Sequence, residues 1–384
     1  MSNVPKLRFK RFSGDWEKNQ LLNIGKIITG STPSTHIVDY YNGDKLFVSP
    51  SDMNTNRFIN STKTTLTELG FSKGRKVEKY SVCFVCIGST IGKIGQLSED
   101  SITNQQINCI TANKDNSNDF IYSLLESNAP KIKLLAGVQA VPQINKTDFS
   151  KLKFMFPQKQ EQEKIATFLN QVDTKIEQLT KKETLLKEYK KGVMQKIFNQ
   201  EIRFKADDGS EFCGWQDKKL SSLCSIKKGS QLNKDTLTEV GDYPAINGGI
   251  NPSGYTTNYN TEAHTITISE GGNSCGYVNF ITTNFWSGGH NYSLQELKKN
   301  IENLYLFQYL KHNEHLIMRL RVGSGLPNIQ KGDINNFKVL VPCLEEQNKI
   351  ANFLSSIDTK VEQTQKQLEL GKEFKKALLQ QMFV

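Results

Sequence analysis

Residues able to carry out catalysis are scarce in this sequence. Cys83 and Cys86 have C-x-x-C spacing, but they lie in an apolar run expected to form a strand, where positions three apart face opposite sides, and no second pair accompanies them. His312 and His315 are three apart on an expected helix, and a solvated helix face explains them better than a metal site, since His-Glu-x-x-His is absent. We therefore expect neither a catalytic residue nor a bound metal in this chain.

Cofactor-binding motifs are equally scarce. Neither the phosphate loop G-x-x-x-x-G-K-[ST] nor the nucleotide fingerprint G-x-G-x-x-G occurs. Asn251-Pro-Ser-Gly-Tyr255 shares part of the Asn-Pro-Pro-aromatic box of amino-methyltransferases, but the second Pro is missing and a Gly/Asn/Pro turn explains it better. We expect no cofactor to be bound by this chain.

Polar residues that could recognise a ligand gather in Gly-rich loops between apolar runs. Asn and Gln can make paired hydrogen bonds to adenine, Arg and Lys to guanine, and Ser, Thr and backbone N–H groups can bind phosphate. Gly-rich turns also let a backbone approach a ligand closely. The loops favour nucleic acid as the ligand, and the candidate contact residues are Ser31, Thr32, Ser89, Thr90, Lys93, Asn104, Gln105, Gln106, Gln139, Ser230, Gln231, Asn247, Asn273, Ser274, His290, Asn291, Arg321 and Ser324.

A plainer interpretation is that Asn and Gly simply make turns, and for any single residue it is at least as good. The formal net charge of +10 favours a polyanionic partner, although it also fits a merely basic surface. No apolar run is long enough to span a membrane, and residues 1–10 lack the apolar core of a signal peptide, so we expect a soluble cytoplasmic protein.

The elements that must position these loops include one stretch that occurs twice. Residues 157–177 recur in residues 342–362 at a constant offset of 185, and the match still holds at Gln195/Gln380 and Phe198/Phe383. In each copy the apolar residues follow a helical period. Each copy therefore predicts one helix of about forty residues, roughly 60 Å long.

A narrow apolar seam on so long a helix needs a partner, and the other copy is the obvious candidate. We expect the two helices to pair as a coiled coil through Ile165, Phe168, Leu169, Val172, Ile176, Leu179, Leu186, Ile350, Phe353, Leu354, Ile357, Val361 and Leu368. Tyr189 and Phe374 are assigned to the same apolar stripe. The alternative is that each helix packs separately on its own globular region.

Each helix follows a globular region, and the two regions share a plan. Strands are expected at 45–48, 82–87, 107–111 and 152–156 in the first region, and at 265–268, 277–281 and 337–341 in the second. A short helix is expected from Asp119 through Leu125, with Pro130 as its breaker, and residues 297–321 are expected to be helical. Because the scaffolds agree while the loops differ, the two regions are typical of readers of two different targets.

The expected fold class is α+β. Two globular α/β domains, 1–157 and 201–342, are separated by two long antiparallel coiled-coil helices, 158–200 and 343–384, in a pseudo-twofold internal repeat.

The helix starts and the segments before them carry a family resemblance. Pro157-Gln-Lys-Gln-Glu-Gln-Glu-Lys-Ile-Ala166 and Pro342-Cys-Leu-Glu-Glu-Gln-Asn-Lys-Ile-Ala351 are each followed by Phe-Leu and Asp-Thr-Lys. Gln143-Ile-Asn-Lys146 and Asn328-Ile-Gln-Lys331 each follow a Pro. With these motifs the chain resembles, over nearly its whole length, the DNA-specificity subunit of type I restriction–modification systems.

The resemblance implies a non-catalytic subunit with two target-recognition domains. Each domain is expected to read one half of a bipartite, asymmetric site in double-stranded DNA, and the paired helices are expected to set the spacing. Two modification subunits are expected to supply S-adenosylmethionine and to methylate adenine at N6, and restriction subunits are expected to use ATP and Mg. The family has no universal base-contact motif, so the contact residues rest on loop position alone.

Two other functions stay open at this point. One is a non-catalytic coiled-coil scaffold or protein-binding adaptor without DNA specificity, whose binding would be insensitive to salt because it lacks phosphate contacts. The other is a stand-alone methyltransferase, which the missing cofactor motif disfavours and a cofactor-binding assay would settle.

Overall fold

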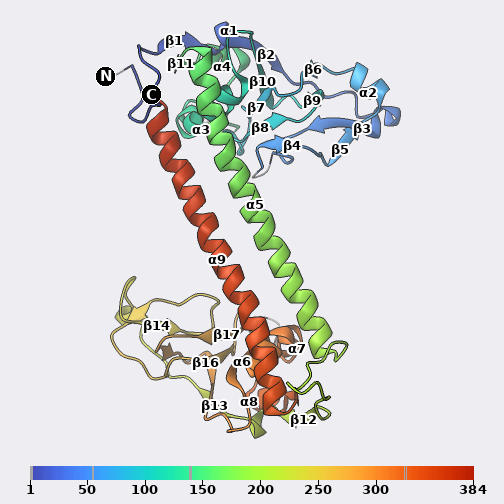
Figure 1. The fold of residues 1–384 in the computed structure, drawn as a ribbon, viewed down its shortest axis with the longest axis vertical. Helices are drawn as coiled ribbons and strands as arrows, with labels where there is room; N and C mark the ends of the chain where they lie inside the picture. The colour runs from blue at the N-terminus through green and yellow to red at the C-terminus, as the bar shows by residue number, and fades with distance from the viewer. Residues whose placement is uncertain (1–2, 54–55, 138–140, 324, 326) are drawn as a thin grey trace. The chain divides into compact units, whose positions relative to one another are not determined.

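The computed structural model describes residues 3–53, 56–137, 141–323, 325 and 327–384, and the predicted contact residues Gln139 and Ser324 lie outside them. The chain forms two compact units. Unit 1 comprises residues 1–182 and 364–384, and unit 2 comprises residues 183–363. Each unit thus combines one globular region with part of both long helices, α5 (Lys159–Phe198) and α9 (Leu344–Met382) (Figure 1).

Unit 1 is a mixed α/β structure. Its strands are β1 (Glu17–Gln20), β2 (Gly25–Thr29), β3 (Tyr41–Val48), β4 (Phe58–Ile59), β5 (Thr64–Leu66), β6 (Lys76–Val77), β7 (Val82–Val85), β8 (Ile94–Leu97), β9 (Ser101–Thr103), β10 (Ile107–Ala112) and β11 (Lys153–Phe156). Its short helices are α1 (Leu21–Ile24), η1 (Val38–Tyr40), α2 (Glu68–Ser72), α3 (Asn118–Leu134) and α4 (Lys146–Ser150). Hydrogen bonds join the strands in the orders β2-β10-β7-β8-β4, β5-β3-β9-β6 and β1-β11. Neighbours are antiparallel except β3 with β9 and β4 with β8.

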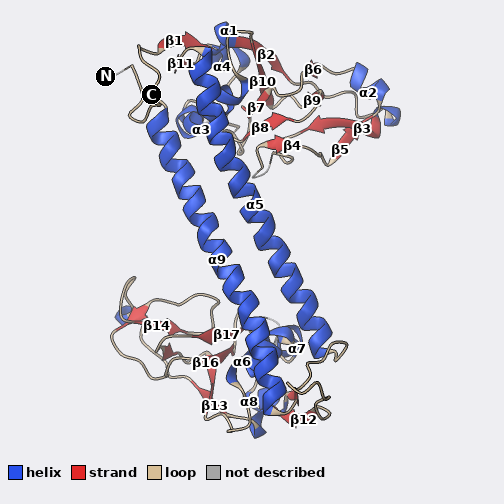
Figure 2. Ribbon diagram, viewed as in Figure 1, coloured by secondary structure: helices blue, strands red, loops and turns tan. Residues whose placement is uncertain are grey.

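The central strand β7 of unit 1 is buried on both faces. Val82 and Phe84 pack into one apolar cluster, whereas Cys83 and Val85 pack into another. This division follows from the two-residue period of a strand. Helix α3 covers this sheet against β7, β8 and β10 (Figure 2).

Helix α3 is longer than the sequence predicted: it continues past Pro130, the residue that was expected to break it. The Ser117 side chain accepts a hydrogen bond from the Phe120 N–H and caps the start of the helix. A Pro removes one backbone hydrogen bond and costs about 3 kcal/mol in a helix interior. Beyond it, Ile132 is 2% exposed, so burial of the next turn offsets that loss.

Unit 2 has a similar plan. Its strands are β12 (Gln216–Lys219), β13 (Ser225–Lys228), β14 (Tyr243–Ile246), β15 (Tyr255–Thr256), β16 (Thr265–Ser269), β17 (Val278–Ile281), β18 (Trp286–Ser287), β19 (Asn291–Gln295) and β20 (Lys338–Val341). Its short helices are η2 (Leu220–Ser222), η3 (Lys234–Thr236), α6 (Asn303–His312), α7 (Glu314–Arg319) and α8 (Lys331–Asn336). The strand orders are β13-β19-β16-β17, β15-β14-β18 and β12-β20, with only β14 and β18 parallel among these described strands. All seven strands expected from the sequence are present.

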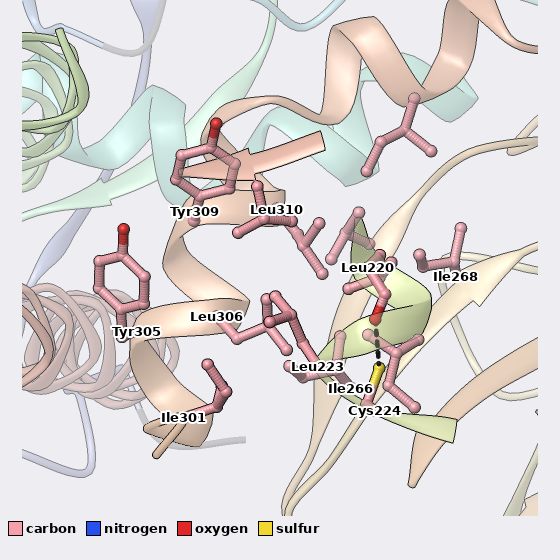
Figure 3. Close-up of a cluster of buried hydrophobic side chains, with 14 of the residues drawn as sticks. Leu220, Leu223, Cys224, Ile266, Ile268, Ile301, Tyr305, Leu306, Tyr309 and Leu310 are labelled. Atoms are coloured by element: carbon pink, nitrogen blue, oxygen red, sulfur yellow. Dashed lines mark hydrogen bonds between the residues drawn. The ribbon is translucent and has the colours of Figure 1, made fainter. Parts of the chain in front are cut away.

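The core of unit 2 forms where α6 faces the β13-β19-β16-β17 sheet. Tyr305 and Tyr309 project from α6 beside Leu306 and Leu310, and Ile266 and Ile268 come from β16 (Figure 3). The single helical stretch expected over residues 297–321 is wrong. Residues 297–302 precede α6, and a break at Asn313 separates α6 from α7, where the Asn313 side chain donates to the Tyr309 carbonyl at 2.9 Å and competes with the helical pattern.

Within each unit the two long helices run in opposite directions. In unit 1, Lys375 of α9 binds Asp173 of α5 at 2.6 Å, and one turn further on Gly371 lies next to Ile176. In unit 2, Lys190 binds Asp358, also at 2.6 Å. These two ion pairs occupy equivalent positions of the repeat, at the offset of 185.

The predicted helix-pairing residues are divided between two environments. Ile165, Leu169, Ile350, Leu354 and Ile357 are buried in the unit cores, each of which also contains the last turn of the other long helix. Half-buried residues packed against those cores are Phe168, Val172, Phe353 and Val361. Leu179 and Leu368 are buried, and Ile176 and Leu186 are half-buried. Tyr189 and Phe374, by contrast, are 54% and 53% exposed, so assigning them to the buried stripe was wrong.

The repeated Glu-Gln pair at each helix start has the same contacts in both units. Glu161 binds Arg8 through two hydrogen bonds, and Glu346 binds Arg203 in the same way. The amide group of Gln162 donates to the Pro157 carbonyl and accepts from the Ser117 N–H, and Gln347 makes the equivalent bonds to Pro342 and Glu302. The motif therefore anchors each long helix to the globular region before it. None of the helices in the described ranges is long and apolar enough to cross a membrane.

Candidate nucleic-acid interface

In unit 1, four loops meet at one edge of the five-stranded sheet. The loop after β2 joins the loop before β10 where the Thr32 hydroxyl donates to the Gln105 side chain at 2.6 Å. The Asn104 and Gln106 side chains bond each other at 3.0 Å, and the Gln106 amide reaches the Ile87 carbonyl of the turn between β7 and β8 at 3.5 Å. The same turn is held to the fourth loop by the bond from Gly88 N–H to the Pro142 carbonyl.

The meeting of the first two loops depends on Gly30. A Cβ atom there would lie 2.1 Å from the Asn104 carbonyl oxygen and 2.3 Å from that of Thr103. The equivalent residue of unit 2 is Gly229, where a Cβ would lie 2.2 Å from the Gly288 carbonyl oxygen. Both glycines are therefore needed for close approach of two backbones, and this explains why Gly occurs at both positions.

Unit 2 assembles the corresponding loops with different side chains. The Asn247 side-chain oxygen accepts from the His290 N–H at 3.1 Å, and the Ser274 hydroxyl donates to the Gly248 carbonyl at 2.7 Å. Gln231 lies over Gly289, where a Cβ would be 2.6 Å from the Gln231 side-chain oxygen. The Gly272 N–H donates to the Pro327 carbonyl on the fourth loop, as the Gly88 N–H donates to the Pro142 carbonyl in unit 1.

The remaining predicted contact residues also lie on these loops, with one exception in the interior. Ser89 and Lys93 are exposed and Thr90 is half-buried on the turn between β7 and β8. Exposed positions in unit 2 include Ser230, Asn273 and Arg321, and Ser31 in unit 1 is half-buried. Asn291 is only 1% exposed and its side chain bonds the Ser287 hydroxyl, so it stabilises its own turn and offers no surface to a ligand.

The sequence analysis missed three charged residues at these loops, namely Arg75, Lys228 and Glu270. The exposed Arg75 sits beside the entry loop, with its N–H on the Ser31 hydroxyl at 2.7 Å and its guanidinium on the Thr29 carbonyl at 3.1 Å. In unit 2, Lys228 and His290 flank the buried carboxylate of Glu270, at 2.6 and 3.6 Å. The basic run Lys73-Gly-Arg-Lys76 was a usable signal for Arg75, whereas nothing in the sequence placed Glu270 next to Lys228.

The C-x-x-C pair does not form a site. Cys83 faces Cys109 on one side of β7, and Cys86 accepts a hydrogen bond from the Asn108 side chain on the other. Burial raises the pKa of the Cys86 thiol to about 12, which keeps it protonated. Across the described ranges, no group of three or more His, Cys, Asp or Glu residues could hold a metal ion.

Each unit thus presents a loop surface of the same construction but of different chemistry. Unit 1 offers amides and hydroxyls with Lys93 and Arg75, and unit 2 offers amides and hydroxyls with an imidazole and the cations Lys228 and Arg321. Such groups can bind phosphate and the edges of bases.

Comparison with known proteins agrees with this duplication. The model of the type I restriction modification DNA specificity domain matches residues 13–188 and again 213–370. A putative type I specificity subunit of Mycoplasma pneumoniae is 33% identical over 171 residues, which are 44% of this chain and 45% of that protein, so this chain spans about half the length of that relative.

Longer matches are more distant. The type I restriction enzyme MjaIX specificity subunit of Methanocaldococcus jannaschii is 22% identical over 403 residues, covering 95% of this chain and 92% of that one. The crystal structure of the type I restriction–modification S subunit from M. genitalium covers 99% of both chains with a TM-score of 0.72 at 19% identity, and so shares the fold. Since the two matches to this domain model together cover most of the sequence, the chain belongs to the type I restriction modification DNA specificity family.

Proposed function

We propose that this chain is the non-catalytic DNA-reading subunit of a type I restriction–modification complex. Each globular domain, 1–157 and 201–342, reads one half of a bipartite, asymmetric DNA site through its loop surface. The observation that carries the proposal is the pair of loop surfaces, built on equivalent glycines but lined by different side chains. One scaffold with two sets of contacts suits two different half-sites.

The two long helices set the distance between the half-sites. We propose that they pair as an antiparallel coiled coil with pseudo-twofold symmetry, and the opposite directions of α5 and α9 within each unit support this. Inserting one heptad into each helix should lengthen the unread gap by about 10 Å, roughly three base pairs, because a helix rises 1.5 Å per residue. Both half-site sequences should stay unchanged, and altered half-sites would argue against the helices acting as a spacer.

The chemistry belongs to other subunits in this proposal. Two modification subunits dock on this chain, bind S-adenosylmethionine and methylate adenine at N6, and restriction subunits bind ATP and Mg. The family membership supports assembly with other subunits of such a system.

Methylome sequencing tests the proposal. Cells with and without this gene are compared for methyladenine motifs while the partner methyltransferase is active. The proposal predicts that one bipartite motif with a fixed unread gap disappears on deletion. If every motif persists, DNA reading by this chain is refuted, and the adaptor function takes its place.

A further inference from the structure

The loop surface of unit 2 is built over one buried carboxylate, that of Glu270. Its side chain is 9% exposed and lies directly after β16. The Lys228 ammonium donates to this carboxylate at 2.6 Å and the Tyr292 hydroxyl donates at 3.0 Å, while Nδ1 of His290 lies 3.6 Å away. The Lys228 and His290 side chains are 53% and 61% exposed, so two basic groups at the surface share one buried anion.

Unit 1 carries neutral residues at the same backbone positions. The equivalent residues are Thr29 and Lys228, Asn108 and Tyr292, and Cys86 and Glu270. In each unit the first two pair across neighbouring strands, and the N–H of the third donates to the carbonyl of Gln106 or His290. In unit 1 the Thr29 hydroxyl bonds Asn108, whose amide donates to the Cys86 thiol. The two units therefore share this backbone arrangement and differ in charge.

The ion pair of unit 2 is not required by the scaffold, because unit 1 forms the same arrangement without it. Burying a carboxylate is unfavourable unless it is paired and hydrogen-bonded, and neutral residues often serve folding equally well. Burial and the hydrogen bond to Glu270 raise the pKa of Tyr292, so its hydroxyl stays protonated and donates to the carboxylate. A charged pair that folding does not need, at the base of a candidate binding surface, indicates a role in binding.

Glu270 has two effects on Lys228. A lysine side chain is flexible, and holding it in one place costs conformational entropy. The contact with Glu270 holds the ammonium at the loops before a ligand arrives, and it offsets the positive charge, so a phosphate gains less from Lys228 than from a free lysine. An ammonium has three N–H donors, and Glu270 accepts from one, which leaves two for a ligand.

Guanine is the base that best matches two donors. In the major groove it presents two acceptors, O6 and N7, whereas adenine presents one acceptor and one donor, cytosine a donor, and thymine one acceptor beside a methyl group. We infer that Lys228, held by Glu270, reads a guanine in the half-site of unit 2, and that Glu270 is a positioning residue for this contact. The inference rests on the proposed function, and it adds the base and the residues that recognise it.

The test measures DNA binding by the full chain assembled with its modification subunits, at several salt concentrations. The DNA carries the methylated motif, and each base pair is replaced in turn within the half-site that exchange of residues 201–342 assigns to unit 2. Glu270→Gln keeps the shape of the side chain and removes its charge. The matched control is Glu296→Gln, because Glu296 binds the neighbouring Lys227 at 2.6 Å in an exposed ion pair.

The wild type and the control should discriminate at least about tenfold against replacement of one G·C pair. Glu270→Gln should lose this discrimination. Its slope of log affinity against log salt concentration should become steeper by about one, because the released ammonium can bind a phosphate. Glu270→Asp retains the charge, so it should keep the wild-type slope and most of the discrimination, which a purely structural role of the side chain would not produce.

A double variant separates this role from a folding defect. Lys228→Met with Glu270→Gln removes both charges and leaves no unpaired carboxylate, so it should lose the discrimination without a steeper slope. A half-site without guanine, unchanged discrimination in either variant, or an equal loss of affinity for every sequence would overturn the inference and leave the proposed function intact. A wild-type complex that binds all sequences alike would refute the proposed function itself.

Discussion

The ion pair between Lys375 and Asp173 should be the most important charged contact between the long helices. The Lys375 ammonium lies 2.6 Å from both Asp173 and Glu126, and the Lys375 and Asp173 side chains are 15% and 9% exposed. Burial raises the pKa of Glu126, which shows that its surroundings already disfavour the charged carboxylate. Replacing Lys375 by Met keeps the aliphatic stem and removes the ammonium that binds both carboxylates.

The size of the effect follows from burial. Removing one partner of a buried ion pair costs about 3–5 kcal/mol. Arg57 remains 3.8 Å from Asp173 and the site is not fully dry, so we expect about 2–4 kcal/mol for Lys375→Met. At about 2–4 °C per kcal/mol for a unit of this size, its melting temperature should fall by about 4–16 °C. The control Lys187→Met removes an exposed contact with Glu183 four residues away and should cost at most about 0.5 kcal/mol.

Differential scanning calorimetry of the full chain measures these changes. The equivalent variant Lys190→Met should have an intermediate effect, because the Asp358 side chain is 34% exposed and also accepts a hydrogen bond from Gln308. Adding Asp173→Asn to Lys375→Met should recover part of the loss, since one unpaired charge is removed. If Lys375→Met destabilises the chain no more than Lys187→Met, the claim that this ion pair is the most important charged contact between the long helices is refuted.

Three further predictions concern the loop surfaces and unit 2. Gly30→Ala and Gly229→Ala should each lower the free energy of unfolding by about 1–3 kcal/mol and abolish DNA binding, measured by denaturation and binding titrations. The control Gly332→Ala should do neither, because nothing lies within 4 Å of its added Cβ. Gln105→Ala should weaken binding of the correct DNA site by about 1–3 kcal/mol and leave the salt dependence of binding unchanged. Lys93→Ala should instead reduce the slope of log affinity against log salt concentration by about one. A changed slope for Gln105→Ala would contradict its role as a base contact. Burial and the nearby His315 lower the pKa of His312 below 6.5, so as the pH falls the unfolded chain takes up a proton before the folded chain does. The contribution of neutral His312 to folding stability is therefore present above about pH 6.5 and should be lost at lower pH. His312→Gln should flatten this pH dependence, which is measured by unfolding midpoints between pH 7 and 5.

Much of the scaffold could be predicted because it depends on local patterns and on repetition. Short apolar runs located β7, β10 and β16, and the helical period located α5 and α9. Failures arose where tertiary contacts decided the outcome. Burial of Ile132 carried α3 through Pro130, and the side chain of Asn313 interrupted the helix between α6 and α7.

The loop surfaces were harder to predict than the scaffold. The structure brings Thr32 next to Gln105 and Asn247 next to His290, which loop position in the sequence did not specify. Loop position also could not distinguish an exposed polar side chain from one that stabilises its own turn, as Asn291 does. The periodicity that assigned Tyr189 and Phe374 to the buried stripe also could not distinguish a buried seam from an exposed helix face, because apolar residues can recur at helical spacing on both.

The most direct test of the account is an exchange of one globular region. Residues 201–342 are replaced by the corresponding region of a relative with a different methylation motif, both long helices are kept, and the methylome of cells carrying the hybrid is sequenced. The account predicts a motif in which one half-site changes to that of the relative, while the other half-site and the unread gap stay as they were. A hybrid that changes both half-sites, or neither, while still directing methylation would contradict the claim that each globular region reads its own half of the DNA site.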